Sequence, residues 1–186
     1  MKKIDLIKKK IRQLVTKPNE RSHSISTWKW VLKLKPEASV SLQIAALGHD
    51  IDRSVEGNPV NFQQSAFKKY GEYKRHHSIA SARIMHRLMV ESGFGNNISK
   101  KVKNLVENHE CGKRGDVKIL TEADSLSFFE NSIPRYMKTH TLRQTRDKIR
   151  FMYCRLSSPA KNLIDNMNFK DKRAKQIVKE ATTSAS

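Results

Sequence analysis

Two adjacent ionisable residues at the end of an apolar stretch are the first feature of this sequence that points to chemistry. His49 and Asp50 follow Leu42, Ala45 and Ala46, which stand seven, four and three residues before the histidine and share a helical face with it. A histidine and an aspartate that close a buried face are costly unless they are paired or bound to a metal. His49 and Asp50 are therefore candidate metal ligands.

The same helical spacing separates the two histidines of the doublet His76-His77. His77 lines up with Ala80 and Ile84, three and seven residues further on, and is therefore expected to face inward. His76 lines up with Arg83, seven residues further on, and is expected to face solvent. Only His77 joins the candidates.

Three more polar residues fall on apolar faces. His109 completes a stripe that contains Val102 and Leu105, seven and four residues before it. Asp124 has an apolar residue four positions away on either side, so its carboxylate also points inward. His23 opens a helix seven residues before an inner tryptophan.

A single histidine at the end of an apolar stripe is more often a hydrogen-bonded core residue than a metal ligand, and a buried aspartate can simply cap a helix. Inward histidines and aspartates on five helices together favour a metal site built inside a helical bundle. Imidazole and carboxylate ligands suit Fe, Mn, Co, Ni or Zn, and also Mg where carboxylates dominate. The candidates are His23, His49, Asp50, His77, His109 and Asp124.

In their order and helix placement these residues resemble the H…HD…H…H…D signature of the HD-domain phosphohydrolases. The resemblance covers residues 20–135, and the segments that carry it are ALGHDID, HHSIASARI, VENHECG and TEADSLSFF. It implies a two-metal centre in which Asp50 bridges the ions. The first ion would be bound by His23, His49, Asp50 and Asp124, and the second would be completed by His77 and His109.

The same resemblance implies hydrolysis of a phosphoester or phosphoanhydride by metal-activated water, with Asp50 and Asp52 as catalytic residues. Basic residues near the ligands are then candidates for binding the substrate phosphate, although each is equally well explained as a solvated surface charge. These candidates are Arg53, Lys74, Arg75, Lys113 and Arg114.

The elements that must position these residues are all expected to be helical. No alternating run of four or more residues argues for a strand, glycine and proline are scarce, and each break between helices contains turn-forming residues. We predict an all-α, HD-domain-like bundle of about 8–9 helices with no sheet. The helices are expected at about 2–16, 21–35, 38–52, 62–69, 72–93, 97–110, 116–137, 140–156 and 158–181.

The 186 residues are enough for one domain, so we expect residues 1–186 to form a single unit. Within it, residues 20–135 form the metal-binding core. A basic helix at 1–17 precedes this core, and helices with a basic tail at 139–186 follow it.

Composition and charge narrow the setting and the partners. No apolar stretch is long enough to span a membrane, and Cys111 and Cys154 lack a metal-binding or disulfide spacing, so we expect reduced thiols in a cytoplasmic protein. The formal net charge of +19 favours a phosphate-bearing partner. We favour a nucleotide-like small molecule over nucleic acid, because no RNA- or DNA-binding motif is visible. The sequence leaves the oligomeric state open.

Two other functions fit the same residues. HD-fold diiron oxygenases use the same six-ligand pattern, so the ligands alone do not separate oxygen activation from hydrolysis. A polyanion-binding or nucleic-acid-binding protein with a vestigial metal site is the second alternative. Its binding surfaces would be the basic N-terminal helix and the tail segment 170–179.

Overall fold

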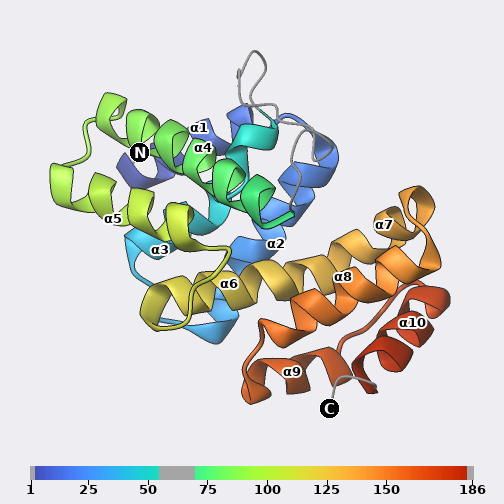
Figure 1. Cartoon of the computed structure of the whole chain (residues 1–186). Coiled ribbons are helices and arrows are strands. Elements are labelled where there is room, and N and C mark those ends of the chain that lie inside the picture. The colour runs from blue at the N-terminus through green and yellow to red at the C-terminus, as the bar shows by residue number, and fades with distance from the viewer. Residues whose placement is uncertain (1–2, 55–69, 184–186) are drawn as a thin grey trace.

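The computed structural model describes residues 3–54 and 70–183 (Figure 1). These residues are all in helices or their connections and contain no strand, which confirms the predicted all-α class. None of the described helices is both long enough and apolar enough to cross a membrane. The helices are α1 (Lys3–Leu14), α2 (Pro18–Leu34), α3 (Val40–Gly48), α4 (Tyr70–Glu91), α5 (Asn96–Asn108), α6 (Gly115–Ser127), α7 (Ile133–Thr139), α8 (Leu142–Cys154), α9 (Ser158–Asp165) and α10 (Lys172–Thr183), with the short helices η1 (Ile51–Arg53) and η3 (Phe128–Ser132).

Helix α3 is the centre of the N-terminal half. It packs against α1, α2, α4, α5 and α6, and its residues Leu42, Ile44, Ala45 and Ala46 are fully buried because a helix surrounded by other helices has no polar face. Gly48 ends α3 where the helix passes close to α4. A Cβ at Gly48 would collide with the side chain of Met85, so a larger residue here would displace this buried methionine.

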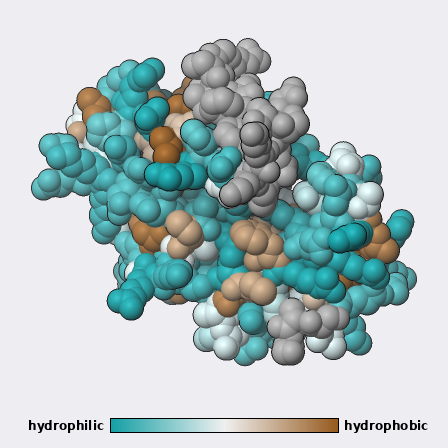
Figure 2. Space-filling model, viewed as in Figure 1, coloured by the Kyte–Doolittle hydropathy of each residue, from teal (hydrophilic) through white to brown (hydrophobic). Residues whose placement is uncertain are grey.

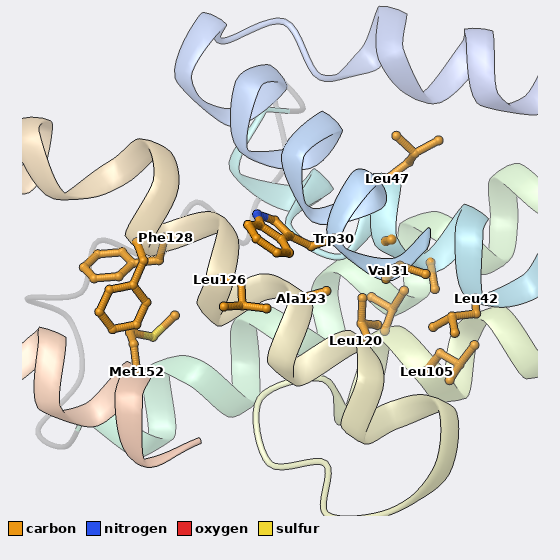
Figure 3. Packing of buried hydrophobic residues seen from close by; sticks show 14 of the residues in the cluster. Trp30, Val31, Leu42, Leu47, Leu105, Leu120, Ala123, Leu126, Phe128 and Met152 are labelled. Atoms are coloured by element: carbon orange, nitrogen blue, oxygen red, sulfur yellow. The ribbon is translucent and has the colours of Figure 1, made fainter. Parts of the chain in front are cut away.

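Helix α6 connects the two halves of the molecule. It packs against α2 and α3 on one side and α9 on the other, while α8 and α10 pack against each other in the C-terminal half (Figure 1). Figure 3 shows Leu120 of α6 beside Val31 and Leu42, and Phe128 beside Met152 of α8. One apolar core therefore extends from the N-terminal helices to α8.

The sequence predicts a helix over residues 116–137 that Pro134 ends or kinks, and the structure shows this helix interrupted. After α6, the five residues of η3 form a π-helix, and α7 then continues the chain to Thr139. Pro134 explains the change, because proline has no N–H to bond the carbonyl four residues earlier and its ring crowds that carbonyl. A wider π turn accommodates the missing bond.

Two other predicted boundaries change. The single helix predicted over residues 158–181 is wrong, because α9 ends at Asp165 and α10 starts at Lys172. Asp171 starts the second helix by accepting a hydrogen bond from the backbone N–H of Ala174, 3.0 Å away, as an N-cap residue does. The helix predicted at 62–69 lies outside the described residues.

The face shown in Figure 2 is mainly hydrophilic, with a few small apolar areas, as the charge of +19 leads one to expect. The six candidate ligands are buried.

Candidate metal centre

Five helices bring the six predicted ligands together. His23 comes from α2, His77 from α4 and Asp124 from α6, while His49 and His109 are the C-cap residues of α3 and α5. All six are buried, and His76 is exposed, as the helical spacing predicted. The connection after α3 turns tightly into η1, which places Asp50 beside His49.

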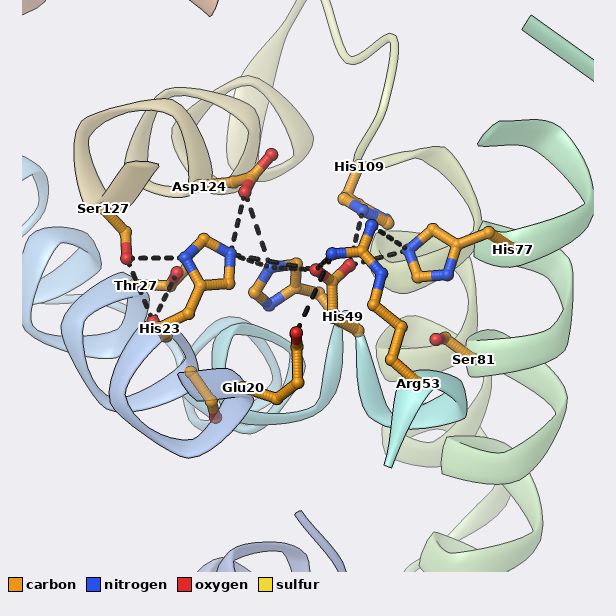
Figure 4. A network of polar contacts seen from close by, with 12 residues as sticks. Glu20, His23, Thr27, His49, Arg53, His77, Ser81, His109, Asp124 and Ser127 are labelled. Carbon is orange, nitrogen blue, oxygen red and sulfur yellow. Dashed lines mark hydrogen bonds and ion pairs between the residues drawn. The ribbon is translucent and has the colours of Figure 1, made fainter. Parts of the chain in front are cut away.

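The four imidazoles form a row (Figure 4). Successive ring centroids are 5.1 Å apart for His23 and His49, 5.2 Å for His49 and His109, and 5.7 Å for His109 and His77. His23 and His49 form one neighbouring pair of imidazoles, His109 and His77 form the second, and a carboxylate lies close to each pair.

The first pair, with two carboxylates, has the spacing of a metal site. The Nε2 atoms of His23 and His49 are 3.2 Å apart, and Oδ1 of Asp124 lies 3.1 and 3.6 Å from them. Oδ2 of Asp50 lies 3.8 and 3.7 Å from the same two nitrogens. Ligands about 2.1 Å from a common ion would be about 3 to 3.5 Å apart, so these four atoms fit around one ion with small adjustments.

Asp50 faces the second pair with its other oxygen. Oδ1 of Asp50 lies 2.7 Å from Nε2 of His77 and 3.6 Å from Nε2 of His109. Glu110 brings a second carboxylate to this histidine pair, with Oε1 3.9 Å from Nε2 of His109. The two oxygens of Asp50 thus face different histidine pairs, which is the arrangement that a bridging carboxylate needs.

Hydrogen bonds to the outer ring nitrogens turn the Nε2 atoms toward the cluster. Nδ1 of His49 lies 2.9 Å from the carbonyl of Ala46, and Nδ1 of His109 lies 2.7 Å from that of Val106. A carbonyl only accepts, so Nδ1 of both histidines carries a proton, and in the neutral ring the lone pair is at Nε2.

Ser127 fixes His23 in the same way. Its hydroxyl donates to the carbonyl of His23, 3.1 Å away, and so accepts from Nδ1 of the same residue at 2.8 Å. Metal-binding histidines are commonly held by such outer contacts.

One of the nitrogens that face the cluster has no hydrogen-bond partner among the described residues. Nε2 of His109 is buried without a hydrogen bond, and the Nε2 atoms of His23 and His49 lie only 3.2 Å apart beside two carboxylates. Buried polar atoms are rarely left unpaired without a reason. These histidines and aspartates therefore form a group that can hold metal ions.

The carboxylates attract positive charge strongly. Burial lowers the pKa of His49, but the charge of Asp50 and the hydrogen bond to Asp124 outweigh it and raise the pKa to about 9. Burial and Arg53 lower the pKa of His77, but Asp50 and Asp52 raise it to about 9. Burial raises the pKa of Asp50, whereas Arg53 and the nearby histidines hold it well below its ordinary value.

Asp52 and Arg53 approach different nitrogens of His77, Asp52 at Nδ1 and Arg53 at Nε2. Oδ1 of Asp52 lies 2.7 Å from Nδ1 of His77, a short contact that is not well aligned for a hydrogen bond, and it accepts from the hydroxyl of Ser81. Asp52 therefore contacts the ring nitrogen of His77 that does not face Asp50. The guanidinium of Arg53 lies 2.5 Å from Oδ2 of Asp50, and the side chain lines the adjoining cleft.

The other predicted phosphate-binding residues lie further away. Lys74 is buried and forms an ion pair with Glu110, and Arg75 is exposed beside it in a second cavity. Lys113 and Arg114 are exposed and line neither of these cavities in the part of the chain that the structure describes.

A cleft of about 260 Å³ adjoins the cluster and contains basic residues that the sequence reasoning did not select. Lys148 and Arg155 reach it from α8 and the residue that follows it, and Arg135 reaches it from α7. Arg155 Nη1 donates to Oδ2 of Asp124 at 2.8 Å, and its Nη2 donates to the carbonyl of His109 at 3.1 Å.

The spacing of residues in the sequence does contain a signal for Lys148 and Arg155. Lys148 and Arg155 are seven residues apart and share a helical face with the buried Met152, so both stand at the edge of an apolar stripe. Glu110 directly follows His109. These positions were overlooked because a charge at the edge of a stripe usually belongs to the solvated surface.

Comparison with known proteins gives one match. A family model described as a domain of unknown function, DUF4202, matches residues 2–178. No curated protein and no solved structure matches the chain.

Proposed function

The chain belongs to the DUF4202 family, and we propose that it is a metal-dependent phosphohydrolase that cleaves a phosphoester or phosphoanhydride of a nucleotide-like molecule. The observation that carries the proposal is the convergence of four imidazoles and two carboxylates, with the oxygens of Asp50 divided between two histidine pairs.

The charges around the cleft favour an anionic substrate. Its lining contains four carboxylates, those of Glu20, Asp50, Glu110 and Asp124. It also contains four basic side chains, those of Arg53, Arg135, Lys148 and Arg155. Since the protein charges already balance, each divalent cation leaves two positive charges for the substrate to neutralise. A phosphate group suits this excess.

Divalent ions held by such ligands supply a water of lowered pKa and neutralise charge on phosphoryl oxygens. The residues of the chain have separate tasks in this proposal. Asp50 ties the two halves of the ligand set together, and Asp52 orients His77. Arg53 and Lys148 border the cleft and bind the phosphate, and Arg155 holds Asp124 in place by its hydrogen bond.

The decisive experiment combines metal analysis with a panel of phosphomonoesters, phosphodiesters and nucleotides, assayed with Mn²⁺ or Fe²⁺. We expect bound metal in the purified protein and hydrolysis of at least one substrate. His77→Ala should lower turnover by at least about a hundredfold, because loss of outer-shell partners alone costs 10–100-fold. His76→Ala is the matched control, because its exposed ring lies one position along the same helix, and this variant should behave as the parent.

The atmosphere of the assay separates hydrolysis from the oxygenase alternative. Turnover of a phosphoester without oxygen supports the proposal, since hydrolysis consumes only water. Oxygen consumption with a small polar substrate and no phosphate release would overturn it. A purified protein without metal, in which Asp50→Ala changes neither stability nor activity, would also overturn it.

A further inference from the structure

A second cavity lies beside the metal centre and has a different character. It measures about 450 Å³, and its walls come from α4, from the end of α5 and from α8. Phe151 and Ile79 give it apolar surface, and Asn108 and Arg75 add polar groups. Glu110 lines both this cavity and the cleft at the cluster, so the two spaces share a wall.

Phe151 forms part of this wall and keeps 38% of its surface exposed. The Nζ atom of Lys74 lies 4.0 Å from the centre of its ring. The Nζ atom of Lys148 lies 5.5 Å from this centre, and the guanidinium carbon of Arg155 lies 5.6 Å from it. Lys148 and Arg155 line the cleft at the cluster, whereas Lys74 lines the second cavity. Phe151 therefore lies where the two spaces adjoin.

The chemistry of the walls selects the kind of group that fits. The amide nitrogen of Asn108 already donates to Asn104 in the same helix, but an aliphatic chain would cover the exposed charge of Arg75 without a hydrogen bond to replace its water, which is unfavourable. A planar heteroaromatic ring can stack on Phe151 and accept hydrogen bonds at its edge. A second phosphate would find mostly apolar surface there.

We propose that the cavity at Phe151 is the subsite for the planar heteroaromatic group, such as a nucleobase, of the substrate whose phosphate binds at the metal centre. This inference rests on the proposed function and narrows it to substrates in which a base-like ring and a phosphate belong to one molecule. Phe151 provides the stacking surface, and the Lys74–Glu110 ion pair marks the boundary between the ring and the phosphate.

Two cysteines allow a direct test that does not depend on activity. Cys111 lines the cavity, whereas Cys154 is exposed elsewhere on the molecule and lines none of the cavities described. The probe is adenosine, which has a base but no phosphate. We expect saturating adenosine to slow alkylation of Cys111 about threefold or more, measured by peptide mass spectrometry, and to leave Cys154 unchanged.

Variants identify the group that causes the protection. Phe151→Leu keeps an apolar side chain but removes the ring, so we expect adenosine affinity to fall about tenfold, within the range that base stacking contributes. Tyr153→Leu removes an aromatic ring from the same helix outside the cavity and should leave protection intact. Equal protection of both cysteines, no protection of Cys111, or unchanged affinity in Phe151→Leu would overturn the proposal.

Kinetics connect the cavity to the substrate. Phe151→Leu should raise KM for adenosine monophosphate about tenfold and leave KM for glycerol 3-phosphate within about twofold. An equal rise for both esters would show a general disturbance and overturn the assignment.

The labelling experiment is repeated in Asp50→Ala, where hydrolysis is not expected. Protection of Cys111 there, with no phosphoesterase activity in the parent protein, would mean that the proposed function fails while a base-binding cavity stands. Hydrolysis of phosphoesters without protection of Cys111 would mean that the proposed function stands and the base-binding cavity fails.

Discussion

At the level of single residues, the geometry of the centre depends on what lies behind each imidazole. His49 and His109 are both C-cap residues of a helix, and each bonds the carbonyl three residues before it. A helix end has unpaired carbonyls, so this position fixes the ring without any other side chain. His23 lies inside a helix and depends on Ser127 instead.

Ser127→Ala should therefore weaken metal binding. Without the hydroxyl, Nδ1 of His23 loses its acceptor, so the ring can rotate and its proton can move to Nε2. We expect the affinity for the metal to fall about tenfold, measured by competition with a chelator.

Ser125→Ala is the control, since this buried hydroxyl donates to the carbonyl of Thr121 within its own helix and not to a histidine. Equal losses in both variants would contradict an orienting role for Ser127.

The pKa values of His49 and His77 predict how stability depends on pH. Both are raised to about 9 by the surrounding carboxylates after the opposing effect of burial, against about 6.5 in an unfolded chain. A raised pKa stabilises the fold fully below about pH 6.5, and the contribution is lost as the pH rises through 9. In the metal-free protein we expect the free energy of unfolding to fall by a few kcal/mol across this window, measured by urea denaturation in the presence of a chelator.

The metal-loaded protein should respond in the opposite sense over the lower part of this range. Metal ligands must be deprotonated, so the affinity for the ion increases with pH. A metal-free protein whose stability is constant or increases between pH 6.5 and 9 would contradict these pKa shifts.

At the level of elements, α8 completes a centre whose candidate ligands all come from earlier helices. Arg155 follows α8, is almost fully buried, and links Asp124 of α6 to the carbonyl of His109 after α5. Burial lowers the pKa of this guanidinium, but Asp124 and Glu110 outweigh that effect and raise it. The C-terminal helices thus carry charge that the centre requires.

Arg155→Met should destabilise the fold by about 3 kcal/mol, because it removes the guanidinium that pairs with the buried carboxylates of both Asp124 and Glu110. Arg150→Met on the same helix removes an exposed ion pair with Asp147 and should cost no more than about 0.5 kcal/mol. Urea denaturation of the metal-free proteins checks both values, and a similar loss in the two variants would contradict the role of Arg155.

The π-helix η3 is the other element that shapes the cleft. It follows directly after the turn that carries Asp124 and Ser127, and the cleft lining continues through Phe128, Ser132 and Tyr136. An uninterrupted α-helix would present the residues after η3 in a different rotation. The break near Pro134 therefore determines which side chains of α7 reach the cleft.

At the level of the whole molecule, the net charge of +19 comes from residues outside the cleft, because the four acidic and four basic side chains of its lining balance. A part of it lies on the exposed face of α10, where Lys172, Arg173, Lys175 and Lys179 point to solvent. Such a face attracts polyanions without reading their sequence.

We expect weak binding of single-stranded RNA that is independent of base sequence and decreases steeply with salt, measured by fluorescence anisotropy between 50 and 200 mM KCl. Replacing the four basic residues of α10 by glutamine should reduce both the affinity and the salt dependence while phosphoester hydrolysis stays unchanged. RNA binding that is insensitive to salt or to these substitutions would contradict a purely electrostatic surface.

The sequence by itself determined the helical class and the inward direction of the candidate ligands. His77 and His109 could be selected because the 3.6-residue period ties each position to a face of its own helix, and that relation needs no knowledge of the neighbours. Residue spacing and the resemblance then indicated a shared centre, and the structure places these side chains next to each other.

Only the tertiary structure decided which charges face the centre. Lys148 and Arg155 reach the cleft because α8 packs near α6, whereas Lys113 and Arg114 do not line it although they closely follow His109 in the chain. Periodicity describes one helix at a time, but the position of a long charged side chain depends on which other helix packs beside it. Pro134 marks a break in the sequence, but the π form of the turn before it and the split between α9 and α10 depend on individual backbone hydrogen bonds and were not visible in the sequence pattern.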